Sequence, residues 1–532
     1  MRVKIFDTQS KYPNIHTLNL NTLEESKIPN YLKLVIIGSL HKLMQSDKKK
    51  VLTNSLMYTS GNILLRFFSF LLIPLYTAFL VPEQYGIVNL AFGFVNVFSC
   101  IIMMGLQYSV VRFYADFKHD KNKVAQLIST IICVVSIFGS MMVVILILSN
   151  NLWNNLLFKR IAFLPVVLLA ILISFVSALY NLYQESLKGM QQAKKSVLLS
   201  YVFFLLMLGS NILTVVVLKQ GATGILTSTF AINLLMVLMM IIDLRKQKLL
   251  YFCINKDILK QLLKYSLPLL PHSLSFNISN FFTRIIINSK MTASMLGFYS
   301  LASQFGGVAD VVSNSVQSAF QPWLFSKLNE TSCNTNNYDD IRNLTNLLLW
   351  LYGLIYLVIG AFAEEAINIM TNIDYHSAWT YVPLFIMSVA IKSPLHFYQN
   401  FMYYHKEMSK YIFLCTMAGC LLSMLLVWFM IPILGVYGAI LADIIALILR
   451  LFITKRMLKH KNTIYSFNKI IIITIIPIIW LGITVLPSYI NLMSEWYYLL
   501  GYKIMMCMGY LIFSLCINKG ISRILIAKFL HR

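Results

Sequence analysis

Fourteen long apolar runs dominate the sequence and restrict the folds that it can adopt. Each run has about 20 residues or more, the length that an α-helix needs to cross the hydrocarbon core of a bilayer. A transmembrane β-barrel would instead show short segments in which apolar and polar residues alternate. We therefore predict an all-α polytopic membrane protein. The runs lie at about 55–81, 87–111, 124–148, 161–183, 197–218, 223–243, 266–289, 296–320, 344–363, 378–402, 411–431, 436–454, 468–487 and 496–517.

The composition excludes a soluble enzyme. Hydrophobic residues make up 58% of the chain and charged residues 12%, whereas soluble domains have about 45–50% and about 25%. The chain has 44 Lys and Arg against 20 Asp and Glu, a formal charge of +24. Such an excess of bases can indicate a nucleic-acid partner. Their distribution along this chain, however, favours a different explanation.

Lysine and arginine concentrate in alternate loops. If the N-terminus is cytoplasmic, the inside segments carry 34 of these residues and the outside loops carry four. Cytoplasmic loops of membrane proteins hold such an excess of bases. The pattern predicts that both termini are cytoplasmic, and it leaves no reason to expect a nucleic-acid partner.

The first six spans recur as spans seven to twelve. Residues at equivalent places in the two halves match at offsets of 211 to 215: Tyr183-Gln184 with Tyr398-Gln399, Lys195 with Lys410, Gly221 and Gly224 with Gly435 and Gly438, and Gly86 with Gly297. Because six is an even number, both copies enter the membrane from the same face, as in transporters built from parallel repeats. We therefore expect two six-helix bundles and two additional C-terminal helices.

These observations divide the chain into six predicted parts. They are a cytoplasmic N-terminal segment at 1–54, a first six-helix bundle at 55–243, a cytoplasmic linker at 244–265, a second bundle at 266–455, two further transmembrane helices at 468–517 and a cytoplasmic tail at 518–532. Residues 44–50 are typical of a short cytoplasmic N-terminus. Met44 is therefore a candidate natural start, and residues 1–43 would then not belong to the native protein.

Four bases lie well within the predicted spans of the two bundles: Arg66, Arg284, Lys392 and Arg450. A base at the centre of a membrane helix costs at least about 2.5–3.5 kcal/mol and therefore faces protein or water. Arg66 and Arg284 lie in the first helix of each bundle, so a cleft between the bundles could present both, with Lys392 nearby, to an anionic substrate. Alternatively, each base pairs with a carboxylate or carbonyl and only orients helices. Arg450 is near the cytoplasmic end of its span and can reach the interface, so we do not place it in the cavity.

Two acids, Asp310 and Asp443, also lie within spans. A buried carboxylate can hold a proton or a sodium ion, which would suit ion coupling, but each could instead form a salt bridge with a base. Four further polar residues are candidates for the cavity or for hydrogen bonds between helices: Asn62, His272, Gln304 and Gln399. Four tyrosines at span ends are typical of an interfacial aromatic belt: Tyr183, Tyr398, Tyr403 and Tyr404. We expect no metal and no cofactor.

Six segments in order resemble one family of transporters. They are Asn54–Asn62, Phe70–Thr77, Pro82–Leu90, Tyr265–Ser273, Thr283–Ile287 and Leu296–Ser300. Together they are similar to bacterial O-antigen and capsule flippases, the polysaccharide-transporter branch of the MOP superfamily, which also contains the MATE multidrug exporters. The resemblance covers about 51–455. One departure is that the family usually has Asp-Arg where this chain has Thr283-Arg284, so Arg284 either meets substrate or pairs with Asp310 or Asp443.

The resemblance implies a flippase and not an enzyme. Its substrate would be an undecaprenyl-diphosphate-linked oligosaccharide, moved from the inner to the outer leaflet of the bacterial inner membrane for O-antigen, capsule or exopolysaccharide assembly. An H⁺ or Na⁺ gradient would drive alternating access, and other polysaccharide-assembly membrane proteins would be partners.

Three alternatives stay open at this point. A MATE-like drug exporter would need buried acids, whereas the first span carries Arg66 and no acid. A glycan polymerase or ligase would need a larger outer loop than the roughly 14 residues found here. An assembly scaffold without transport would give the intramembrane bases no evident role.

Overall fold

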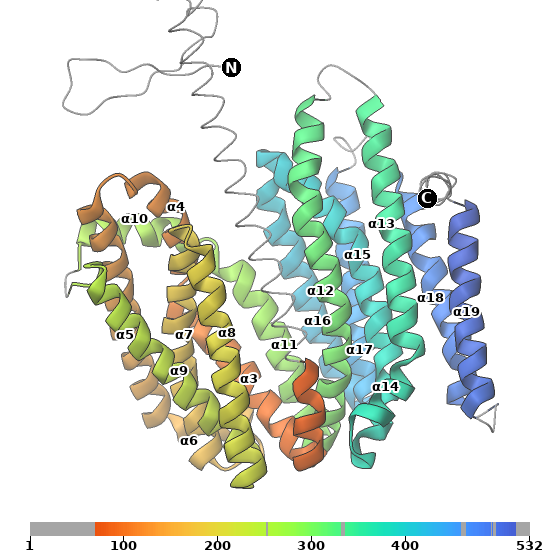
Figure 1. Cartoon of the computed structure of the whole chain (residues 1–532), viewed down its shortest axis with the longest axis horizontal. Helices are drawn as coiled ribbons and strands as arrows, with labels where there is room; N and C mark the ends of the chain where they lie inside the picture. The colour runs from red at the N-terminus through yellow and green to blue at the C-terminus, as the bar shows by residue number, and fades with distance from the viewer. Residues whose placement is uncertain are drawn as a thin grey trace, which may run out of the picture. The chain divides into compact units, whose positions relative to one another are not determined.

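The computed structural model describes residues 70–251, 254–330, 336–458, 464–490, 492 and 496–517. Regular secondary structure in these ranges is helical throughout, as Figure 1 shows. Eleven helices among the described residues are long and apolar enough to cross a membrane. The predicted fold class, an all-α polytopic membrane protein, is therefore confirmed.

The first bundle, as far as it is described, runs from Phe70 to Lys246. Its elements are a short helix Phe70–Phe79, α3 (Pro82–Met103), α4 (Leu106–Phe117), α5 (Lys121–Leu148), α6 (Asn150–Leu157), η1 (Phe163–Val167), α7 (Leu168–Gly189), α8 (Ala193–Asn211), η2 (Ile212–Val217) and α9 (Gly221–Lys246). The apolar run predicted as one span at 87–111 is divided between α3 and α4. The backbone turns left-handed at Met104 (φ 50°) and Gly105 (φ 73°), a conformation that ends helices.

The linker forms α10 (Lys256–Ser266), and the second bundle comprises the helices from α11 to α17. These are α11 (Leu270–Lys290), α12 (Ala293–Glu330), α13 (Asn336–Ala361), α14 (Ala363–Met370), η4 (Ile373–Tyr381), α15 (Val382–Tyr404), η5 (Lys406–Met408), α16 (Ser409–Leu434) and α17 (Val436–Leu458). The predicted spans 266–289 and 296–320 correspond to α11 and α12. Both are long enough to cross a bilayer, but they are more polar than the eleven apolar helices.

The repeat glycines have the same structural role in both bundles. Gly221 and Gly435 begin α9 and α17 with left-handed backbones, φ 56° and 62°, which glycine adopts at no steric cost. One turn later, a Cβ on Gly224 would press on the Thr214 carbonyl, and one on Gly438 would overlap the Met430 carbonyl. Each glycine pair thus lets a helix start close against the preceding helix.

The two bundles meet through α3, which packs against both α11 and α12. Outside the repeat, α18 (Phe467–Tyr489) packs on α13 and α15, and α19 (Trp496–Ile517) packs on α18 and α13. A buried ion pair fixes α19. The Nζ atom of Lys503, which is 0% exposed, lies 3.1 Å from a carboxylate oxygen of Glu364 and 2.7 Å from one of Glu365, both on α14.

Two tyrosines predicted for an interfacial belt are buried instead. Tyr183 is 2% exposed and Tyr398 is 1% exposed. The Tyr183 hydroxyl donates to Asp243 at 2.6 Å, and Lys195 also bonds to this carboxylate. The prediction was wrong for these two residues because it considered only their distance from the span ends. Their helices turn these side chains toward protein and not toward lipid headgroups.

Candidate functional site

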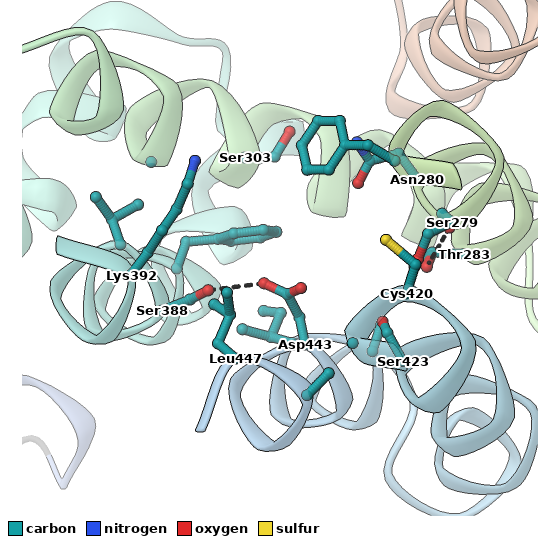
Figure 2. A pocket seen from close by; sticks show the side chains of 18 of the residues that line it. Ser279, Asn280, Thr283, Ser303, Ser388, Lys392, Cys420, Ser423, Asp443 and Leu447 are labelled. Atoms are coloured by element: carbon teal, nitrogen blue, oxygen red, sulfur yellow. Dashed lines mark hydrogen bonds between the residues drawn. The ribbon is translucent and has the colours of Figure 1, made fainter. Parts of the chain in front are cut away.

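A cavity of about 290 Å³ lies inside the second bundle and contains charged side chains from four helices. It is bounded by α11, α12, α15, α16 and α17. Figure 2 shows Lys392 and Asp443 extending toward this space, with Ser303 and Asn280 across from them. Five charged residues line it: Arg284, Asp310, Lys392, Asp443 and Arg450. Of the residues predicted for the site, Arg284, Lys392, Asp310 and Asp443 are therefore brought together.

Lys392 and Asp310 form an ion pair across the cavity lining. The Nζ atom of Lys392 on α15 lies 2.6 Å from Oδ2 of Asp310 on α12. Both side chains are about one quarter exposed, 25% and 26%, so the pair is reached by the solvent of the cavity. Oδ1 of Asp310 is buried and has no hydrogen-bond partner among the described residues. From the sequence, Lys392 could bind substrate or pair with an acid, and Asp310 could hold an ion or pair with a base. The structure places the two residues as a pair.

Arg284 pairs with neither acid of the cavity. Its Nη1 donates to the main-chain carbonyl of Asn89 on α3, at 2.6 Å. Gly93, one turn further along α3, leaves room for this approach, because a Cβ there would lie 3.2 Å from Cδ of Arg284. The neighbouring Thr283 hydroxyl donates to the Ser279 carbonyl. The guanidinium therefore links the two bundles while its positive charge has no acidic partner among the described residues.

Asp443 is exposed toward the cavity. Its Oδ2 accepts a hydrogen bond of 2.7 Å from the hydroxyl of Ser388 on α15, as Figure 2 shows. A carboxylate offers several acceptor positions, and a single hydroxyl satisfies one of them. Asp443 thus retains acceptor capacity that faces the cavity. Ser388 was not predicted, because serine is common at helix interfaces and nothing in the sequence distinguishes it.

The position of Arg450 differs from the one predicted from the sequence. We expected it to reach the membrane interface, but it lines the cavity. Its Nη2 donates to the Thr416 hydroxyl at 2.9 Å, and its Nε is buried with no partner among the described residues. The prediction failed because it did not include the rotation of α17 about its own axis, which turns this side chain toward α16. A contact between these two helices was not evident from the sequence.

Some predicted residues do not line this cavity. His272, Gln304 and Gln399 are absent from its lining, and Nδ1 of His272 is buried without a partner among the described residues. Arg66 and Asn62 lie outside the described residues. The predicted cleft that presents Arg66 together with Arg284 therefore stays a prediction.

The cavity has a net positive charge among the described residues. Three bases and two acids line it, so one positive charge is left over. Arg284 and Arg450 are bonded to uncharged groups, a carbonyl and a hydroxyl. Guanidinium groups bind phosphate through two parallel hydrogen bonds, so this arrangement is suited to a phosphate-containing anion. No cluster of three or more metal-ligating side chains occurs in the part of the chain that the structure describes.

Comparisons with known proteins identify a family, through one family model, and a fold, through solved structures. Residues 51–328 match the family model described as "Polysaccharide biosynthesis protein". "Lsg locus putative protein 1" of Haemophilus influenzae is 21% identical over 380 residues, which is 70% of this chain and 89% of that protein.

Two solved structures share the fold. "Lipid II flippase MurJ, inward closed conformation" aligns with a TM-score of 0.62 at 14% identity, over 88% of this chain and 100% of that one. An inward-facing "multidrug resistance MATE family transporter of the MOP superfamily" aligns with a TM-score of 0.58 at 15% identity, over 75% and 96%.

Proposed function

This chain belongs to the family of polysaccharide biosynthesis proteins, and from that premise we propose that it is a flippase for lipid-linked oligosaccharides. It moves undecaprenyl-diphosphate-linked units from the cytoplasmic to the outer leaflet of the bacterial inner membrane. The units then enter O-antigen, capsule or exopolysaccharide assembly. The chain is a multi-pass membrane protein, and the proposed orientation has both termini in the cytoplasm.

The observation that carries the proposal is the charged cavity within the second bundle. Bases inside a membrane helix are expensive and commonly mark a substrate path. Here Arg284, Lys392 and Arg450 line one space, and two of them have only uncharged partners. A diphosphate has the charge and the oxygen acceptors that such a lining can bind.

The size of the cavity indicates which part of the substrate it holds. At about 290 Å³ it is at the lower end of the range for ligand pockets, about 300–1,000 Å³. That space suits the diphosphate and not a whole oligosaccharide. We therefore assign the diphosphate to Arg284 and Lys392, with the sugars extending beyond the cavity and the polyprenyl chain remaining in lipid.

Asp443 is the candidate for ion coupling, with Asp310 beside Lys392 as a second. Asp443 faces the cavity with acceptor positions to spare and can take up H⁺ or Na⁺ when a cation gradient is present. Because Asp310 already holds Lys392, an anion that binds Lys392 competes with Asp310. This competition would couple substrate binding to a rearrangement of α12 and α15.

An exporter of organic cations is the second candidate function. The exposed carboxylate of Asp443 favours it, since such exporters need acids, and the MATE fold is shared. The three bases of the same lining oppose it, because each would repel a cationic drug. The two functions therefore predict opposite substrate charges.

The test is translocation in liposomes that contain the purified full-length chain. An undecaprenyl-diphosphate oligosaccharide is placed on one leaflet, and its exposure on the other is followed with a membrane-impermeant glycosidase. We expect transport by the wild type, and a loss of at least tenfold in Arg284→Gln and Lys392→Gln. The matched control is Arg245→Gln, which removes an exposed arginine outside the cavity.

The outcomes separate the candidates. Transport that survives both cavity substitutions would retain the flippase and refute this assignment of the diphosphate site. Failure to move the cognate lipid, together with movement of an organic cation that Asp443→Asn abolishes, would establish the exporter. Correct folding of each variant is checked by gel filtration and thermal unfolding.

A further inference from the structure

A second cavity, of about 580 Å³, lies where the second bundle meets the C-terminal helices. It shares no lining residue with the charged cavity of the transport site. Its walls come from the ends of α15 and α17, the start of α18 and the segment before α18: Tyr398, Phe452, Lys455, Arg456, Leu458, Tyr465 and Phe467. The basic loops place these helix ends on the predicted cytoplasmic side. The cavity volume is typical of a ligand pocket.

The mouth of this cavity is strongly basic. Lys455 and Arg456 occupy the last turn of α17 and are exposed. The sequence has no acidic residue between Asp443 and Glu495, and the exposed Lys469 in the first turn of α18 adds further positive charge. Basic pockets between transmembrane helices on the cytoplasmic side bind anionic lipid headgroups. The charge thus points to an anion at the membrane surface.

The aromatic walls hold one of these bases in place. The Nζ atom of Lys455 lies 3.6 Å from the centre of the Phe467 ring, within the range of a cation–π contact. Phe452 and Tyr398 have ring centres 5.8 and 6.5 Å from that of Phe467. Aromatic boxes of this kind can also bind a quaternary ammonium ligand. Here the chain's own lysine occupies the ring face, so a cationic ligand would be excluded by position and by charge.

An unsatisfied hydroxyl supplies an independent sign of a ligand. Tyr398 is 1% exposed and lines the cavity, yet its hydroxyl has no hydrogen-bond partner among the described residues. Buried hydroxyl groups nearly always have partners, because leaving one unpaired costs about 1–3 kcal/mol. The oxygen itself has almost no accessible surface, so a small shift of the ring toward the cavity would let it donate to a phosphate oxygen there.

We propose that this cavity binds the phosphate headgroup of an anionic phospholipid from the cytoplasmic leaflet. Lys455 and Arg456 bind the phosphate, and the Tyr398 hydroxyl donates to it. The acyl chains follow the apolar face of α17 away from the cavity. Residues Phe452, Ile448 and Ile445 lie four and three positions apart on that face and are 52%, 38% and 42% exposed. The site would connect lipid composition to the junction between α17 and α18.

The experiment measures lipid binding by the full-length chain and requires no transport. Phosphatidylglycerol and phosphatidylcholine are titrated in mixed micelles, and bound lipid is counted by native mass spectrometry. We expect phosphatidylglycerol to bind, with an apparent Kd that rises on the order of tenfold in Lys455→Gln/Arg456→Gln. Tyr398→Phe keeps the ring and removes the hydroxyl, and should weaken binding by roughly fivefold.

The repeat provides a matched control. Arg245 and Lys246 are an equally exposed pair in the last turn of α9, the counterpart of α17 in the first bundle. Arg245→Gln/Lys246→Gln therefore removes the same charge from the equivalent position and should leave binding unchanged. Equal weakening by both double variants would overturn the proposal, since it would indicate attraction by net charge alone.

Two competition arms identify the source of the phosphate. Soluble glycerol 3-phosphate should not displace the lipid, because it lacks acyl chains to follow α17. Undecaprenyl diphosphate should also fail to displace it at equal concentration. Displacement by either compound would refute a phospholipid site, the first in favour of a soluble phosphate and the second in favour of the transported lipid. All of these readouts are independent of whether the chain is a flippase.

Discussion

Gly86 and Gly297 touch backbone to backbone where α3 crosses α12. A Cβ on Gly86 would overlap the carbonyl oxygen of Ala293, and a Cβ on Gly297 would overlap that of Pro82. These glycines are also repeat partners, 211 residues apart. Equivalent residues of the two bundles thus form the crossing, at the end of the helices predicted to face outward.

The first prediction concerns Gly86→Ala and Gly297→Ala. Each added methyl group forces the backbones apart by about 1–2 Å to restore ordinary contact, so each variant should lose about 1–3 kcal/mol of stability. The outer ends of the bundles should also separate. Spin labels at Leu152 and Ile369, both 84% exposed, should report longer distances in a background without native cysteines.

Gly209→Ala is the matched control for the crossing. It adds the same methyl group to helix α8, where nothing lies within 4 Å of the added atom. Label distances should therefore remain at wild-type values, and stability should stay the same or rise by about 0.5–1 kcal/mol, because alanine favours a helix over glycine. Unchanged distances in the two crossing variants would show that α3 and α12 are not the contact that holds the outer ends together.

The second prediction tests the Lys392–Asp310 pair by a double-mutant cycle. Lys392→Met and Asp310→Asn each leave one charge without its partner, while the double variant removes both charges. Because each side chain is about one quarter exposed, part of the interaction is screened by solvent. We expect a coupling of about 1–3 kcal/mol from thermal unfolding in detergent. Strictly additive effects would mean that Lys392 does not depend on Asp310.

The third prediction concerns Asp443 and ion coupling. Asp443→Asn keeps the size of the side chain and its hydrogen bond with Ser388 but removes the charge that would hold a cation. Gradient-driven transport should fall by roughly tenfold or more, while exchange without a gradient continues. Imposing H⁺ and Na⁺ gradients separately identifies the ion. Asp257→Asn, at an exposed acid of α10, is the control, and an equal loss there would contradict a specific role for Asp443.

Among the described residues, the positions of the long apolar helices were largely predictable because they depend on local sequence. An apolar run of about 20 residues predicts a membrane helix without any knowledge of the residues that pack against it. The left-handed backbones at Gly221 and Gly435 likewise favour glycine at those positions. The break at Gly105 was missed, since the residues around it are as apolar as those of a continuous helix.

The charged contacts were less predictable because their partners are distant in the chain. Lys392 meets Asp310 from 82 residues away, and Arg450 enters the cavity only because α17 packs on α16. Which way a polar side chain points depends on the rotation of its helix against its neighbours. Composition and periodicity do not determine that rotation when almost the whole surface of the helix is apolar.

Lys503 is the clearest example of a charged residue whose partners are distant in the chain, and the last prediction concerns it. It is fully buried within an apolar helix, and its two acidic partners lie 139 and 138 residues earlier, on α14. Removing the partners of a buried charge costs about 3–5 kcal/mol, whereas replacing the charge with an apolar group of similar size can be nearly neutral. Glu364→Gln/Glu365→Gln should therefore destabilise the chain by about that amount.

Lys503→Met is the informative comparison. It removes the buried charge and leaves two carboxylates whose side chains are 23% and 27% exposed and therefore partly hydrated, although Oε2 of Glu365 is buried without a partner among the described residues. We expect a smaller loss of stability than for the double glutamine variant, with α19 still docked, measured by thermal unfolding and by protease resistance of the C-terminal helices. If Lys503→Met is the more damaging change, then packing of the lysine stem, and not pairing of its charge, holds α19 against the second bundle.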